Sequence, residues 1–116
     1  MKSQMSRGVT AVFRALSVEK RRGIVRLLAE RTLCVGALSN RLGISAGAVS
    51  QHLRVLKYAG LVTAERRGHF IHYRLARNAA ARCRAAVDSL FKMPTESKKG
   101  GRKCAAEKRS AKGRRN

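Results

Sequence analysis

The sequence predicts a mainly helical domain with one small β-hairpin, in the order α-α-α-α-β-β-α. Apolar residues recur at helical spacing from residue 5 to residue 56, which indicates a series of amphipathic helices. Residues 61 to 75 alternate as two short strands around Gly68, and a last apolar helical stripe begins at Ala79. Two helices joined by a short turn and followed by a hairpin are typical of a winged helix-turn-helix.

The first two helices are predicted by their apolar stripes. The stripe of the first helix consists of Met5, Val9, Val12, Phe13 and Leu16. Ser17 is a residue type that caps helix N-termini, and Ile24, Leu27 and Leu28 follow it at the spacing of one buried face. We therefore expect Ser17 to begin a second helix.

The third helix is short and leads directly into the fourth. Val35, Leu38 and Leu42 form its buried face, and Gly43 suits the left-handed conformation that closes a helix. Ser45 then provides the N-cap of the fourth helix. These two helices and the turn between them are the predicted helix-turn-helix.

The fourth helix has a buried face and a face suited to a nucleic acid. Val49, Leu53 and Leu56 recur at i, i+4 and i+7, and Gly60 ends the helix. The opposite face is small, polar or basic and consists of Gly47, Ser50, Gln51, Arg54 and Lys57. Because this face carries no carboxylate, it suits close approach to phosphates and base edges.

The wing is predicted from two strands that meet at a basic tip. The strands are residues 61–67 and 69–75, and Ile71, Tyr73 and Leu75 alternate toward one face. We expect the fourth helix to address the major groove through Ser50, Gln51 and Arg54, with Gly47 and Ala48 allowing close approach. We expect phosphate or minor-groove contacts from Lys57, Arg66, Arg67 and His69.

The last helix carries an apolar stripe that no later segment of the sequence could cover. Asn78 is a suitable N-cap, and the stripe consists of Ala79, Cys83, Ala86, Val87 and Leu90. A stripe left uncovered in one chain favours packing against a second copy. The expected dimer interface combines the first and last helices through Val9, Val12, Phe13, Cys83, Val87 and Leu90.

The charge of the chain indicates a polyanionic partner. Its 116 residues include 27 Lys and Arg against 6 Asp and Glu, a formal net charge of +21. Neutralising phosphates releases counterions and favours binding to DNA. Residues 93–116, with nine basic and two acidic residues and no aromatic residue, are predicted to be a disordered basic tail that follows a domain of residues 1–92.

The same sequence argues against a membrane or secreted protein. No apolar run approaches the roughly 18 residues that a spanning helix needs, and the apolar stretch at residues 9–16 is too short for a secretory signal. We therefore expect a cytoplasmic protein without a membrane partner, whose three cysteines are normally reduced.

The motifs together resemble the arsenic-repressor (ArsR/SmtB) family of bacterial transcription regulators over about residues 5–92. The matching segments are IVRLLAE (24–30), LCVGAL (33–38), SQHLRVL (50–56), AGLV (59–62) and HYRL (72–75). The resemblance implies a homodimer joined through the first and last helices that binds imperfect operator palindromes near promoters. It also implies, for most members, release of DNA when a metal or another inducer binds.

The chain departs from the sensing patterns of that family. Arsenic sensors carry a Cys-x-Cys pair at the start of the third helix, and here Gly36 stands at the second cysteine. Zinc and nickel sensors use Asp and His pairs on the last helix, where this chain has Asp88 and no histidine. Persulfide sensors use a cysteine in the second helix, at the position of Arg26. The resemblance therefore assigns no inducer.

Three cysteines are the candidates for metal or thiol sensing. Cys83 lies on an apolar stripe, where a thiol ordinarily serves packing. Cys34 lies at the N-terminus of the third helix, whose dipole favours a thiolate. Cys104 in the tail could join both in a trithiolate site for a thiophilic metal or metalloid. No cofactor is expected to be required for DNA binding.

Two other classes of function compete with a dimeric repressor. A nucleoid-packing or RNA-associated protein would be equally basic, but it would lack a defined recognition helix. An enzyme is disfavoured, because the sequence has no glycine-rich phosphate loop, no carboxylate pair and no nucleophile with an evident base. The sequence is therefore best interpreted as a sequence-specific regulator of transcription that binds double-stranded DNA as a homodimer.

Overall fold

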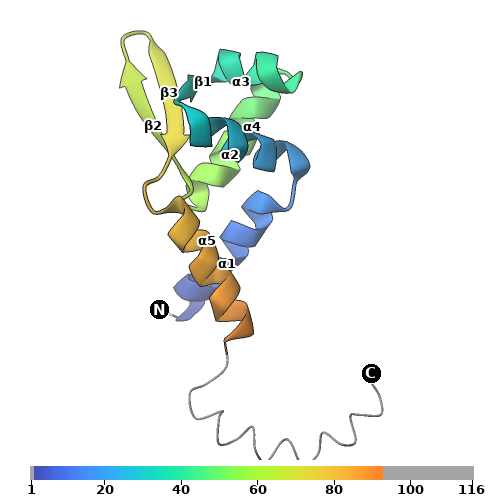
Figure 1. Ribbon diagram of the computed structural model, residues 1–116, viewed down its shortest axis with the longest axis vertical. Coiled ribbons are helices and arrows are strands. Elements are labelled where there is room, and N and C mark those ends of the chain that lie inside the picture. The colour runs from blue at the N-terminus through green and yellow to red at the C-terminus, as the bar shows by residue number, and fades with distance from the viewer. Residues whose placement is uncertain (1, 93–116) are drawn as a thin grey trace, which may run out of the picture.

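The computed structural model describes residues 2–92, and it describes side chains from residue 8 onward. Its elements are α1 (Lys2–Leu16), α2 (Glu19–Glu30), β1 (Leu33–Cys34), α3 (Val35–Leu42), α4 (Ala46–Tyr58), β2 (Val62–Arg67), β3 (Phe70–Leu75) and α5 (Ala79–Phe91) (Figure 1). The predicted order of four helices, a hairpin and a final helix is confirmed. The predicted tail at residues 93–116, Cys104 and the side chain of Met5 lie outside the described residues.

The strands form one antiparallel sheet in the order β1-β3-β2. The two-residue strand β1 was not predicted, because so short a segment shows no alternation; Leu33 pairs with Tyr73 and Cys34 with His72. The hairpin pairs Val62 with Leu75 at its base. The turn at its tip is longer than predicted, since His69 lies in the turn beside Gly68 rather than on the strand.

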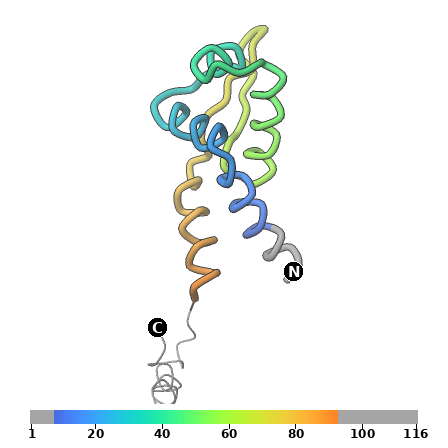
Figure 2. The backbone as a smooth tube through the Cα atoms, turned by 90° about the vertical axis from the view of Figure 1, so that its right-hand side faces the viewer, coloured from blue at the N-terminus to red at the C-terminus, as the bar shows by residue number. Residues whose placement is uncertain are grey.

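The two ends of the molecule are formed by different helices and strands. In Figure 1 the hairpin and α3 lie at one end, and α1 and α5 lie side by side at the other. Figure 2 shows α5 extending away from the rest of the fold. The helix α4 runs between these ends, so it connects the wing region with the pair of terminal helices. Within residues 2–92, no helix combines the length and apolarity required to cross a membrane.

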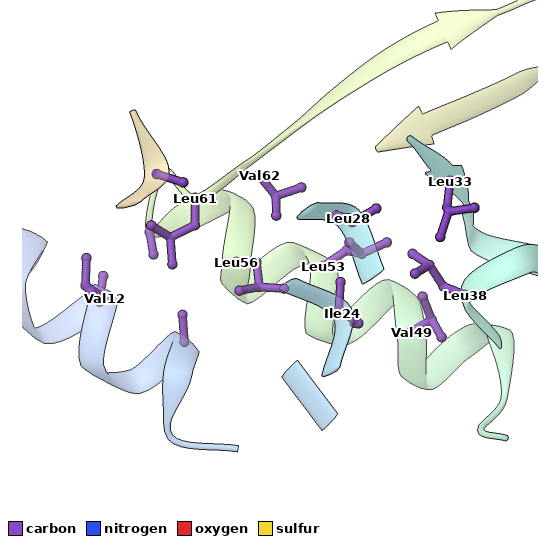
Figure 3. Packing of buried hydrophobic residues seen from close by; sticks show 14 of the residues in the cluster. Val12, Ile24, Leu28, Leu33, Leu38, Val49, Leu53, Leu56, Leu61 and Val62 are labelled. Atoms are coloured by element: carbon purple, nitrogen blue, oxygen red, sulfur yellow. The ribbon is translucent and has the colours of Figure 1, made fainter. Parts of the chain in front are cut away.

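The core holds α4 in place along its whole length. The largest fully buried side chains are Ile24, Leu38, Val49, Leu53, Leu56 and Leu61, which converge from α2, α3, α4 and the turn after α4 (Figure 3). Each of them stabilises the fold by about 1.5–3 kcal/mol through removal of apolar surface from water. The three α4 members are the i, i+4, i+7 set predicted from the sequence, and they leave the opposite face of the helix outward.

The N-cap hydrogen bond predicted from the sequence is present at α4, whereas those predicted at α2 and α5 are not. The Ser45 side chain accepts a hydrogen bond of 3.1 Å from the Ala48 amide, as predicted. Ser17 instead donates its hydroxyl to the Arg14 carbonyl at 2.8 Å, so it closes α1, and Val18 is the N-cap of α2. Asn78 stands at the N-cap of α5 but makes no side-chain cap, because its backbone is not in the extended conformation that capping requires.

Gly60 joins α4 to the sheet in a left-handed conformation with φ +79. A Cβ atom at this position would lie 2.9 Å from the Cζ atom of Arg82, so the guanidinium of α5 lies directly against the end of α4. Any side chain would be disfavoured twice, by the backbone angle and by this contact. The position of α5 is thereby coupled to that of α4.

Candidate nucleic-acid interface

The outward face of α4 presents the side chains that the sequence assigned to base reading. Ser50, Gln51, Arg54 and Lys57 are all exposed, and Gly47 is exposed at the first turn. Ala48 is only half-buried, with its amide held by Ser45. Since the core fixes the other face, these groups are presented by a rigid helix, which is the condition for base readout in the major groove.

A groove runs between α4 and the wing strand β3. It has a volume of about 520 Å³ and is lined by Ser50, Leu53, Arg54, Lys57, Tyr58 and Tyr73. Two cations and three hydroxyls around one depression can donate hydrogen bonds to phosphate oxygens. The sequence interpretation assigned neither tyrosine to this surface. Tyr58 is 67% exposed and follows Arg54 by four residues, which places both on one helix face and could have identified it.

The wing tip is basic and fully accessible. Arg66, Arg67 and His69 are exposed. Glu65 lies 3.7 Å from Arg67, but both side chains are about half exposed, so this ion pair is weak and leaves the arginine able to reach a phosphate. Ile71, predicted to share one strand face with Tyr73 and Leu75, is exposed at 40%, whereas those two are half-buried, because the hairpin projects beyond the helices that would cover it.

Acidic side chains are almost absent from this surface. Of the acidic residues that the structure describes, Glu19 and Glu30 belong to α2 and Asp88 to α5. Only Glu65 lies on the wing, and α4 contains none. The face formed by α4 and the wing therefore attracts a polyanion.

The cysteines do not assemble into a metal site within the part of the chain that the structure describes. Cys34 is the N-cap of α3 and Cys83 lies on α5, both half-buried. Burial raises the pKa of the Cys83 thiol, an effect that the nearby Arg82 and Arg84 oppose only in part. No group of three or more His, Cys, Asp and Glu side chains among residues 2–92 could hold a metal ion.

An apolar face of α5 remains uncovered in the single chain. Val87 and Leu90 are exposed, as is Phe91, which the sequence interpretation did not include. Phe13 of α1 is also exposed, whereas Val9 and Cys83 are half-buried. Val12, predicted to lie at a dimer interface, is only 2% exposed and belongs to the core of the chain itself. The exposed apolar side chains of α1 and α5 could pack against a second copy of the chain.

Comparison with known proteins matches residues 19–64 to the family described as bacterial regulatory protein, arsR family. The arsenical resistance operon repressor of Escherichia coli (strain K12) is 35% identical over 86 residues, which cover 73% of this chain and 74% of that protein. The HTH-type transcriptional repressor SmtB of Mycobacterium tuberculosis is 46% identical over 65 residues, which cover 56% of this chain. The match spans about half, 48%, of the length of that relative.

Solved structures show the same fold. An ArsR-like transcriptional regulator from Rhodococcus sp. RHA1 superposes with a TM-score of 0.69 at 29% identity, over 93% of this chain and 96% of that chain. The homodimeric winged helix-turn-helix DNA-binding domain of a possible ArsR-family transcriptional regulator from Mycobacterium bovis gives a TM-score of 0.65 at 32% identity. This second match covers 83% of this chain and 89% of that chain.

Proposed function

The chain belongs to the arsR family of bacterial regulatory proteins, and we propose that it is a homodimeric repressor that binds an operator palindrome in double-stranded DNA. The observation that carries the proposal is the outward face of α4, which is basic, free of carboxylates and fixed by a buried core. Its relatives in E. coli and M. tuberculosis are described as repressors. Membership of a family of regulators also agrees with the expectation that the chain is not an enzyme.

In the proposed complex α4 enters the major groove. B-DNA has a major groove about 12 Å wide, which admits one helix, and Gly47 and Ala48 keep the first turn narrow. Gln51 and Arg54 then reach base edges, with Ser50 beside them. Lys57 and Tyr58 border the groove next to β3, where a phosphate would sit, and the wing tip extends the contact to the neighbouring backbone or minor groove.

Dimerisation is proposed through α1 and α5. These two helices carry exposed apolar side chains, and they lie at the end of the molecule opposite the wing (Figure 1). The related M. bovis domain is homodimeric. Two recognition helices related by a twofold axis would match two half-sites about one helical turn of DNA apart.

A specificity test separates the roles of α4 and the wing. Gln51→Ala should reduce affinity for the operator by about 1–3 kcal/mol and leave affinity for a scrambled duplex nearly unchanged, because an amide reads base edges. Arg66→Ala should weaken both duplexes by the same factor, because it contacts backbone. Footprinting on the upstream region of the gene supplies the operator, and titration of both duplexes at one salt concentration measures the effects.

The same titration distinguishes a repressor from a nucleoid-packing or RNA-associated protein. Equal proportional losses on both duplexes for Gln51→Ala would remove this residue from base reading. If the wild-type protein showed no preference for any segment of its upstream region, sequence-specific repression would be wrong, and unspecific binding by a basic protein would replace it.

For a response to an inducer, we infer that Cys34 is the primary thiol. Burial raises the pKa of Cys83 and so disfavours its thiolate, the form that acts as a nucleophile and as a metal ligand. Titration of the operator complex with arsenite, zinc and a persulfide donor should show any release of DNA abolished in Cys34→Ser and retained in Cys83→Ser. Release that persists in Cys34→Ser would contradict this assignment.

A further inference from the structure

Arg21 is the one charged side chain that is buried in the described part of the chain, with 9% exposure. It belongs to α2, yet its guanidinium contacts two other helices. Nε donates to the Ala15 carbonyl and Nη2 to the Arg14 carbonyl, each at 2.9 Å, at the C-terminal end of α1. Nη1 lies 3.3 Å from Nδ1 of His52, on α4. One side chain therefore connects the dimerisation region with the recognition helix.

We propose that Arg21 is a positioning residue for DNA binding, which holds α4 at a fixed place relative to α1 only while the His52 imidazole is unprotonated. The proposal rests on the proposed function and adds a regulation by pH to it. Arg21 touches no residue assigned to DNA contact, so its effect on DNA passes through His52 and the placement of α4.

The chemistry of the contact requires a neutral imidazole. A guanidinium has only N–H donors, so Nδ1 of His52 must accept, and the imidazole proton must be on Nε2. The carbonyls of Ala15 and Arg14 accept from Nε and Nη2, on the opposite edge of the guanidinium from Nη1. These carbonyls lie at the negative end of the α1 dipole, which favours a cation at this position. Protonation of His52 would place an N–H group and a second positive charge against Arg21, and the contact would be lost.

The surroundings of His52 favour the neutral form. Burial, and then the Arg21 guanidinium, lower the pKa of His52 below its ordinary value of 6.5. The elements packed against α4 are α1, α2, α3 and β2. Their described charged side chains, with those of α4 itself, are Arg14, Glu19, Lys20, Arg21, Arg22, Arg26, Glu30, Arg41, Arg54, Lys57, Glu65, Arg66 and Arg67. Arg21 is the one among them that acts on this pKa.

The sign of the pH effect follows from this lowered pKa. The unfolded chain takes up a proton on His52 as the pH falls through about 6.5, whereas the folded chain resists until a lower pH. The contact is therefore complete above pH 6.5 and is lost as the pH falls toward the folded pKa. A histidine that merely faced DNA would show the opposite sign, because phosphates favour its protonated form.

The first experiment measures operator affinity in steps from pH 7.5 down to about pH 4.5, at constant ionic strength. His52→Asn keeps an acceptor near the position of Nδ1 and cannot be protonated. Acidification should weaken the wild type by about threefold or more relative to His52→Asn, and the matched control His72→Asn should parallel the wild type. Equal pH profiles for the wild type and His52→Asn would overturn the proposal, as would loss of the pH effect in His72→Asn.

The second experiment begins with the free protein, so its first result does not depend on DNA binding and keeps the two proposals separable. In NMR titrations of the free protein, the Arg21 Nε–H resonance should shift with the same midpoint as the His52 imidazole. Arg21→Lys, which retains the charge but cannot reach three acceptors, should remove the Nη1 contact and weaken operator binding at pH 7.5 with the dimer intact. Independent titration of Arg21 and His52 would overturn the linkage, whereas failure of the wild type to select an operator would overturn only the proposed function.

Discussion

Replacing Leu90 by glutamate should convert the protein to a folded monomer that binds operator DNA at least about 100-fold more weakly. Leu90 is 62% exposed in the single chain, so a carboxylate there is solvated in the monomer and does not disturb the core. In the proposed dimer the same carboxylate would be buried without a partner in an apolar interface, at a cost of several kcal/mol. A monomer has only one recognition helix, so it can contact only one of the two half-sites of the operator when it binds.

Sedimentation velocity and operator titration check this prediction, and α5 offers a matched control. Ala81 lies nine residues before Leu90, which is half a turn around the helix, and it is exposed. Ala81→Glu adds the same charge to the opposite face and should remain a DNA-binding dimer. A Leu90→Glu protein that stayed dimeric at the same concentration would show that the dimer forms through another surface.

The sequence predicts those parts of the fold in which a local pattern repeats. Val49, Leu53 and Leu56 determine the inner face of α4, and so they also determine which side chains of that helix point outward. Ser45 and Gly43 are equally local signals, because capping depends on one residue and its own backbone. The outward face of α4, which we propose to contact DNA, could therefore be identified from the amino-acid sequence alone.

Features that depend on distant partners could not be predicted in this way. Strand β1 exists because Leu33 and Cys34 pair with β3, about forty residues later, and two residues carry no period of their own. Ser17 could cap α2 or close α1, and the difference lies in the path of the backbone. Ile71 alternates correctly, but its exposure depends on how far the hairpin projects.

The contact between Arg21 and His52 is the strongest example of this limit. The two residues are thirty-one positions apart, and an arginine among the basic residues of α2 gives no sign of being buried. Only the packing of α1, α2 and α4 around one point brings the guanidinium to two carbonyls and one imidazole. The same packing explains why the His52 side chain contacts Arg21 of α2, although it lies on the helix that we propose to enter the DNA groove.

Arg54→Glu should reduce affinity for the operator by about 100-fold or more and affinity for random DNA by a smaller factor, with the stability of the fold unchanged. Arg54 is exposed on α4 and borders the groove beside β3, together with Lys57. Removal of a charge-assisted hydrogen bond costs about 1.5–3 kcal/mol, and the new carboxylate adds repulsion from the phosphates. Arg54→Ala should lose only the charge-assisted hydrogen bond and add no repulsion. If that hydrogen bond is to a phosphate, the slope of log affinity against log salt should also become shallower by about one.

The control separates a local contact from the overall charge of the protein. Arg26→Glu changes the net charge by the same amount, but Arg26 lies on α2 beside Gly23 and Leu42, outside the groove between α4 and β3. If long-range attraction alone drove binding, both variants would weaken it equally and the losses would disappear together at high salt. A loss much larger for Arg54→Glu, with melting temperatures equal to that of the wild type, would locate the contact at the α4 groove. Equal losses would mean that this groove does not receive the DNA backbone.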